Sequence, residues 1–150
     1  MKLRDDSFQG FNNYEAGQVL TGRLPRGEDL LETLTDLVKE ANIRSGHIKV
    51  LGALKNAKIG YFNQNNRKYY YHEFDSGVEI AHCQGNISIL DGEPFIHAHI
   101  IITDSEGKAY GGHLAEGCEI YVAETIVQEL IGEPQERVNE PESGLSLWEV

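Results

Sequence analysis

The sequence predicts a single α+β domain in which a largely antiparallel central sheet is flanked by a few helices. Its 150 residues fit one domain, and its hydrophobic and charged contents of 40% and 25% are those of an ordinary globular protein. Only one segment has a clear helical pattern, whereas most of the remaining chain alternates short apolar runs with turns. One helix among many short strands favours an antiparallel sheet over repeated strand–helix–strand units.

The helix is predicted over residues 28–41. Acidic side chains occupy its first turn and Lys39 lies near its other end, which matches the polarity of the helix dipole. A first strand is predicted before it, over residues 14–24, and Pro25 ends that strand. The apolar positions of the helix recur at helical spacing and form one stripe, which comprises Leu30, Leu31, Leu34, Leu37, Val38 and Ala41.

After Gly46 the pattern changes to strands. Three consecutive tyrosines at 69–71 follow an Asn-rich turn. Residues 119–130, rich in Ile, Val and Tyr, suit a strand but are also long enough for a helix. The other apolar runs are bounded by turn-forming residues and cover 47–54, 57–62, 78–90, 95–102 and 108–114.

The composition changes after Gly132, which divides the chain into a domain at 1–132 and an acidic C-terminal tail at 133–150. Glutamates dominate the tail and two prolines interrupt any element in it, features that are typical of a loosely ordered segment. Its last residues include Leu145, Leu147 and Trp148. These apolar side chains predict that the tail is partly docked, either on its own domain or on a neighbouring subunit.

The net charge of −11 argues against a protein that binds nucleic acid through its own surface, because such binding relies on Lys and Arg. The segment Met1–Asp6 is charged, and neither a signal-peptide pattern nor a membrane-spanning run follows it. We therefore expect a cytoplasmic protein with no membrane partner. Cys83 and Cys118 form no Cys-x-x-Cys pair and are expected to be buried small hydrophobes, with metal ligation the less favoured alternative.

Three histidines point to a metal site. His97 and His99 are two residues apart in a predicted strand, so their side chains share one face of the sheet. His113 lies in the next predicted strand. If residues 105–107 form a three-residue hairpin loop with Gly107 in the left-handed conformation, His99 lies directly opposite His113 on that face. A two- or four-residue loop would instead place Ala98 opposite His113, unless a bulge corrects the register.

Three imidazoles with a further coordination position open are typical of zinc, although other divalent transition metals also suit imidazole. The alternative is three histidines on a half-exposed sheet face without a metal. The remaining histidines are not part of a comparable pattern of metal ligands and are expected to be ordinary surface or core residues; they are His47, His72 and His82.

Four ordered motifs resemble the plants-and-prokaryotes-conserved (PPC) domain family: Gly27–Asp29, Gly85–Ser88, Asp91–His99 and Gly111–Gly117. The resemblance runs from about Tyr14 to about Leu130. It implies a compact α+β domain, a homotrimer, and a zinc site at the positions of His97, His99 and His113. It also matches Glu79 to an acidic position near that site. Plant members combine the domain with basic AT-hook motifs that contact DNA, and names within the family accordingly carry the phrase "DNA-binding protein".

This sequence has no AT-hook, so the resemblance carries over the oligomerising domain rather than DNA binding, and we expect negligible affinity for DNA. The favoured function is a metal-binding, oligomeric interaction module with a regulatory role and an unidentified protein or small-molecule partner. The alternative is a metal-dependent hydrolase or lyase in which Glu79 or Glu116 supplies the general base. A cupin ranks below both. Thr103 and Asp104 fall where that fold expects a Glu, and Gly111–Gly112 replaces its Pro-x-Gly.

Overall fold

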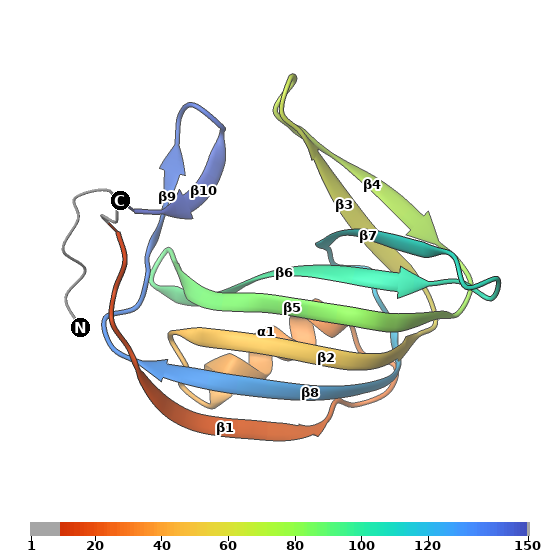
Figure 1. Ribbon diagram of the computed structural model, residues 1–150, viewed down its shortest axis with the longest axis horizontal. Coiled ribbons are helices and arrows are strands. Elements are labelled where there is room, and N and C mark those ends of the chain that lie inside the picture. Colours follow the sequence, from red (N-terminus) through yellow and green to blue (C-terminus); the bar gives the residue numbers. More distant parts are fainter. Residues whose placement is uncertain (1–9, 150) are drawn as a thin grey trace.

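The protein is described by a computed structural model that covers residues 10–149, so the charged segment Met1–Asp6 lies outside the described part. Eight strands form one sheet in the order β1-β8-β2-β5-β6-β7-β3-β4, and two further strands, β9 and β10, form a separate hairpin (Figure 1). The elements are β1 (Glu15–Arg23), α1 (Leu30–Glu40), β2 (Gly46–Leu54), β3 (Ala57–Asn63), β4 (Lys68–Phe74), β5 (Val78–Leu90), β6 (Glu93–Thr103), β7 (Ala109–Leu114), β8 (Ile120–Ile131), β9 (Arg137–Glu140) and β10 (Leu145–Trp148).

Every neighbouring pair in the large sheet is antiparallel, which confirms the predicted α+β class. The sequence analysis expected a few flanking helices, but residues 10–149 contain one α-helix, α1. The segment 119–130, left open between helix and strand, forms β8, which pairs with β1 on one side and β2 on the other. Within the described chain no helix is long and apolar enough to span a membrane.

The core lies between α1 and one face of the sheet. Leu30, Leu34 and Val38 of α1 are fully buried against this face (Figure 1). Along β6, burial alternates with the two-residue period of a strand, so Ile100 and its even-numbered neighbours face the core. His97 and the other odd-numbered residues therefore face the opposite side of the sheet, which α1 does not cover.

Asp29 joins the start of α1 to the segment before β8. Its Oδ1 accepts hydrogen bonds from the backbone N–H groups of Leu31 and Glu32, as an N-cap residue does. Its Oδ2 accepts from the backbone N–H groups of Gly117 and Cys118, at 2.8 and 2.9 Å. One carboxylate thus holds the helix against the segment that follows His113.

Replacing Asp29 with alanine is expected to lower the free energy of unfolding by about 2 kcal/mol, because the cap is lost and two further N–H groups lose a charged acceptor. Asp36→Ala is the matched control, since Asp36 is an exposed acidic residue of the same helix. Chemical denaturation of both variants measures the difference. Equal stability of the two variants would contradict the role given to Asp29.

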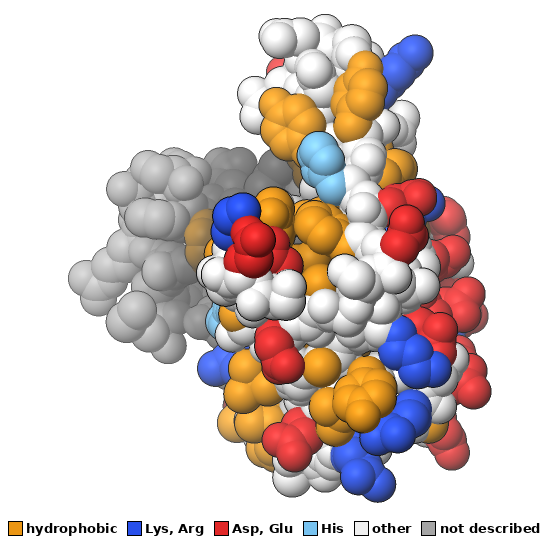
Figure 2. Space-filling view, turned by 90° about the vertical axis from the view of Figure 1, so that its right-hand side faces the viewer, with side chains coloured by type: hydrophobic (Ala, Val, Ile, Leu, Met, Phe, Trp, Pro, Cys, Tyr) orange, Lys and Arg blue, Asp and Glu red, His pale blue; other side chains and the backbone are white. Residues whose placement is uncertain are grey.

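Two hairpins project beyond β6 and β7: β3–β4, which forms one edge of the sheet, and the separate β9–β10 (Figure 1). The β3–β4 hairpin carries exposed aromatic residues, and hydrophobic side chains gather on it at the top of the space-filling view (Figure 2). The β9–β10 hairpin is formed by the acidic C-terminal segment. The tips of the hairpins meet, because Arg67 Nη1 donates a hydrogen bond to the Pro141 carbonyl at 3.2 Å. The exposed tyrosines of the first hairpin are Tyr61, Tyr69, Tyr70 and Tyr71.

Candidate metal centre

The turn between β6 and β7 sets the register of the histidines. Asp104 and Lys108 close the loop through a backbone N–H···O bond of 3.0 Å, and Gly107 has a φ of +77°. The Asp104 carboxylate further accepts from the backbone N–H groups of Glu106 and Lys108. His99 consequently pairs with His113, so the predicted three-residue loop and register are confirmed.

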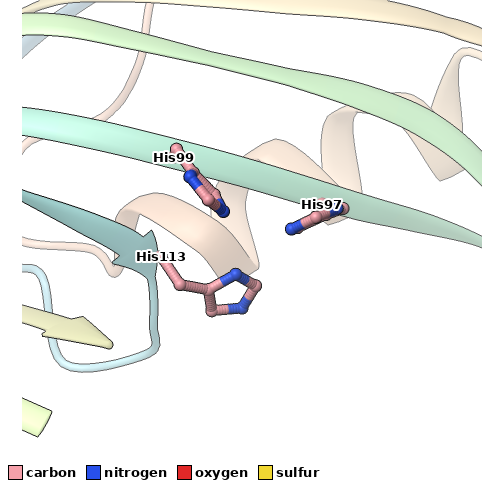
Figure 3. Close-up of side chains that lie close together, drawn as sticks. All are labelled: His97, His99 and His113. Atoms are coloured by element: carbon pink, nitrogen blue, oxygen red, sulfur yellow. The ribbon is translucent and has the colours of Figure 1, made fainter. Parts of the chain in front are cut away.

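The three imidazoles converge on one point above the open face of the sheet (Figure 3). The ring centroids are 5.2 Å apart for His97 and His99, 5.1 Å for His97 and His113, and 5.7 Å for His99 and His113. One nitrogen from each ring can be chosen so that all three lie within 4.8 Å of one another. This arrangement can bind one metal ion through three nitrogen ligands, and neither cysteine belongs to it.

The protonation of the rings suits metal binding. Desolvation lowers the pKa of His97 to about 4, assisted by His113, Arg137 and His99. Desolvation also lowers the pKa of His113, with contributions from His99 and Arg137. Both rings are therefore neutral at pH 7 and keep a lone pair for a ligand. The Nδ1 atom of His113 is buried and has no hydrogen-bond partner within residues 10–149, which is the state expected of a nitrogen kept for a metal.

The surroundings of the cluster come from both projecting hairpins. The Tyr69 ring of β4 lies 5.3 Å from the His113 ring, and desolvation raises the pKa of the Tyr69 hydroxyl. On the other side, Arg137 of β9 donates to Asn86, whose backbone pairs with that of His97. The sequence analysis assigned no role to Tyr69 or Arg137. Only the position of Arg137, as a lone cation in an acidic segment, set it apart in the sequence.

The two glutamates considered as partners of the site lie elsewhere. Glu79 pairs with Thr103, four residues along β6 from His99, or roughly 14 Å at the rise of a strand. Glu116 is exposed and lines a hollow beside α1, together with Glu32 and Asp36. The structure therefore brings His97, His99 and His113 together and places neither glutamate among them.

The cysteines are buried in the core. Burial raises the pKa of Cys83 to about 12 and that of Cys118 to about 11. Such thiols remain protonated and inert.

A shallow pocket of about 510 Å³ adjoins the cluster on the open face. Its volume lies within the range of small-molecule sites. Residues of three neighbouring strands line it: His47, Ile48 and Lys49 of β2, Gln84, Gly85 and Asn86 of β5, and His97 and His99 of β6.

Comparison with known proteins identifies the family. The Plants and Prokaryotes Conserved (PCC) domain matches residues 11–131, which include the three histidines. The chain belongs to the PCC domain family. This confirms the resemblance found in the sequence. The match ends before the β9–β10 hairpin. The three histidines therefore belong to the PCC domain, and Arg137 belongs to the segment after it.

Solved structures share the fold of this PCC-domain protein. A plant- and prokaryote-conserved protein from Pyrococcus horikoshii is 39% identical, with a TM-score of 0.89 over 93% of this chain and 96% of that one. A metal-containing protein from Archaeoglobus fulgidus is 35% identical, with a TM-score of 0.87 over 92% and 97%. A candidate DNA-binding protein from Bacteroides thetaiotaomicron is 26% identical, with a TM-score of 0.82 over 92% and 98%.

Among curated proteins, the bifunctional GlmU proteins of two Synechococcus strains are 30% identical to the PCC-domain protein over 106 residues. The aligned stretch covers 70% of this chain but only 16% of each GlmU protein.

The lowered histidine pKa values predict a pH dependence of the metal-free PCC-domain protein. Between about pH 6.5 and pH 4 the unfolded chain binds a proton at His97 that the folded chain does not, so stability rises with pH in this window. Because the ring is half-exposed, we expect a loss of only about 1–2 kcal/mol on acidification. Denaturation in a chelator at several pH values measures it.

The matched variants for this experiment are His97→Gln and His47→Gln. His97→Gln removes the ring with the most strongly lowered pKa and is expected to reduce the slope of the profile, leaving the contribution of His113. His47 is exposed and stands outside the cluster, so His47→Gln should leave the profile unchanged. The expectation fails if both variants follow the parent protein.

Proposed function

We propose that this protein is a zinc-binding, homotrimeric PCC-domain module that acts in the cytoplasm as a regulatory interaction protein. The observation that carries the proposal is the convergence of His97, His99 and His113 around one point. Three imidazole ligands leave at least one coordination position open, which a protein side chain or a small molecule can fill. Zinc is the favoured ion, and other divalent transition metals are the alternatives.

The metal is tested on protein purified without a polyhistidine tag. Elemental analysis should find about one zinc per chain, or zinc added to the chelated protein should bind with that stoichiometry. No stoichiometric metal and no uptake of added zinc would overturn the proposal.

The trimer is supported by the family and by the uncovered face of the sheet. Four large apolar side chains are exposed on this face, at 43–57% of their full accessibility. Contact with further copies of the chain would remove them from water, which is favourable in proportion to the apolar area buried. Light scattering should give three times the chain mass of 16.8 kDa, and a monomer at tens of micromolar would contradict it. The four residues are Val19, Leu51, Ile101 and Ile126.

DNA binding is not part of the proposal, although the family includes candidate DNA-binding proteins. The net charge of −11 repels phosphate, and the chain contains no basic cluster that would offset it. We expect no saturable binding in a fluorescence-anisotropy titration at physiological salt. Sub-micromolar affinity for duplex DNA would contradict this expectation.

A metal-dependent hydrolase or lyase is the other candidate, because an open metal position can activate water. It ranks second because Glu79 and Glu116, the expected general bases, lie away from the histidines. A panel of phosphoester, ester and amide substrates separates the two functions. Activity that His99→Ala abolishes would favour the enzyme, and no activity on the panel favours the module.

A further inference from the structure

We propose that the pocket beside the three histidines binds a small oxyanion, and that Arg137 of the C-terminal hairpin is the residue that recognises it. The proposal deepens the proposed function, on which it rests, by naming the chemical class of the ligand at the open metal position. It concerns the β9–β10 hairpin, which lies beyond the part of the chain that matches the PCC domain.

Three neutral groups fix the guanidinium of Arg137. Its Nε donates to Ser88 Oγ at 2.8 Å, its Nη2 to Asn86 Oδ1 at 2.9 Å, and its Nη1 to the Ser146 carbonyl at 2.9 Å. Three of its five N–H donors are used in this way, and two remain. The guanidinium is therefore held in place before any ligand arrives.

The charge of Arg137 has no acidic partner among residues 10–149. The ion pairs formed among residues 10–149 do not include it, although acidic residues outnumber basic ones by 24 to 13 in the chain. Aromatic rings pack on it, with the guanidinium carbon 5.2 Å from the Phe95 ring centroid and 5.8 Å from that of Trp148. A half-buried cation without a counterion favours an anion strongly, because little water screens the interaction.

The position of Arg137 couples this charge to the metal site. Asn86, which accepts its hydrogen bond, is the direct cross-strand partner of His97. Asn86 and His97 both line the pocket. Arg137 therefore lies at the margin of the pocket, one strand from the nearest metal-binding histidine.

The lining of the pocket carries no negative charge to oppose an anion. Lys49 contributes a cation to it, and no acidic residue lines it. Lys49 pairs with Gln84, which pairs with His99, so Lys49 stands two strands, or roughly 10 Å, from the cluster.

A carboxylate or a phosphate has the chemistry that these groups would recognise. One of its oxygens can fill the open position of a metal held by the histidines, and another can accept the free N–H donors of Arg137. A single-atom ligand such as chloride offers the same atom to both groups, whereas an oxyanion offers a separate oxygen to each. The ligand class is therefore a small molecule that carries an oxyanion with two or more acceptor oxygens.

The experiment titrates inorganic phosphate and, separately, acetate into the zinc-loaded full-length protein, with chloride as the comparison. Isothermal titration calorimetry measures affinity, and the fluorescence of Trp148, the only tryptophan of the chain, reports changes beside Arg137. We expect saturable binding of phosphate, acetate or both, weakened at least tenfold by Arg137→Met and less by Arg137→Lys. The two arms distinguish a phosphate ligand from a carboxylate ligand.

Arg67→Met is the matched control, because Arg67 donates to the Pro141 carbonyl at the tips of the hairpins and does not line the pocket. It should bind the anion as the parent protein does. Absence of saturable binding of both anions by protein verified to hold zinc, or unchanged binding by a folded Arg137→Met variant, overturns the proposal.

Failure of the metal site gives a different result. If the protein takes up no zinc, the proposed function fails. The same titrations on the metal-free protein then test anion binding at the pocket independently of the metal. Arg137-dependent saturation there still supports the pocket, and its absence overturns it.

Discussion

Replacing His99 with alanine is expected to weaken zinc binding by at least about a hundredfold. Loss of a group that only orients a ligand already costs about ten- to a hundredfold in metal affinity, and His99 is one of three direct ligands in the proposed site. Because His99 is exposed, the metal-free variant should fold with nearly unchanged stability. Competition with a chromogenic chelator measures the affinity.

The same substitution should remove most of the stabilisation that zinc provides. Free zinc at about 1,000 times its Kd raises the free energy of unfolding by about 4 kcal/mol, and a hundredfold weaker site retains about a third of this. His47→Ala is the control, because His47 lies on the same open face and lines the same pocket but is not in the cluster. A His99→Ala variant that zinc stabilises as much as the parent protein would rule out the three-histidine site.

Replacing Gly112 with alanine is expected to destabilise the protein by about 3 kcal/mol and to weaken the metal site as well. A Cβ atom at Gly112 would lie 2.5 Å from the backbone oxygen of Gly60 in β3, and a backbone atom cannot move aside as a flexible side chain can. Strands β3 and β7 would have to separate next to His113, which pairs with Gly60. Zinc affinity should fall because the ligands require accurate placement.

Gly111→Ala is the matched control for this prediction. A Cβ at Gly111 would meet Ile101 Cγ1 at 3.5 Å, which is an ordinary van der Waals contact. We expect its stability to remain within about 0.5 kcal/mol of the parent protein and its zinc affinity to be unchanged. Thermal unfolding and zinc titration of the two variants should therefore diverge, and similar behaviour would contradict the close approach of β3 and β7.

Local chemistry explains why the centre of the site could be predicted. The two-residue period of a strand places His97 and His99 on one face, and the loop that ends at Gly107 sets His99 opposite His113. Both rules act over fewer than about 20 residues of chain. The helix likewise follows from the spacing of its apolar residues and from Asp29 as its cap.

The less local features could not be derived in the same way. Glu79 shares a strand with Asn86, a neighbour of the site, but the length of β5 carries it away from the histidines. Residues 119–130 had a composition that fits either a helix or a strand, and the pairing of β8 with both β1 and β2 decided in favour of the strand. Such pairing depends on partners far away in the sequence.

By itself, the sequence determined the α+β class, the family, the helix and the three converging histidines, because each depends on a short-range period, a turn or a motif. Only the tertiary structure decided what surrounds those histidines. It folded the acidic segment after residue 132 into the β9–β10 hairpin and set Arg137 against Ser88 and Asn86, with Tyr69 of the other hairpin beside His113. These contacts join segments tens of residues apart. Their formation depends on packing and charge between distant segments, which no short sequence pattern predicts.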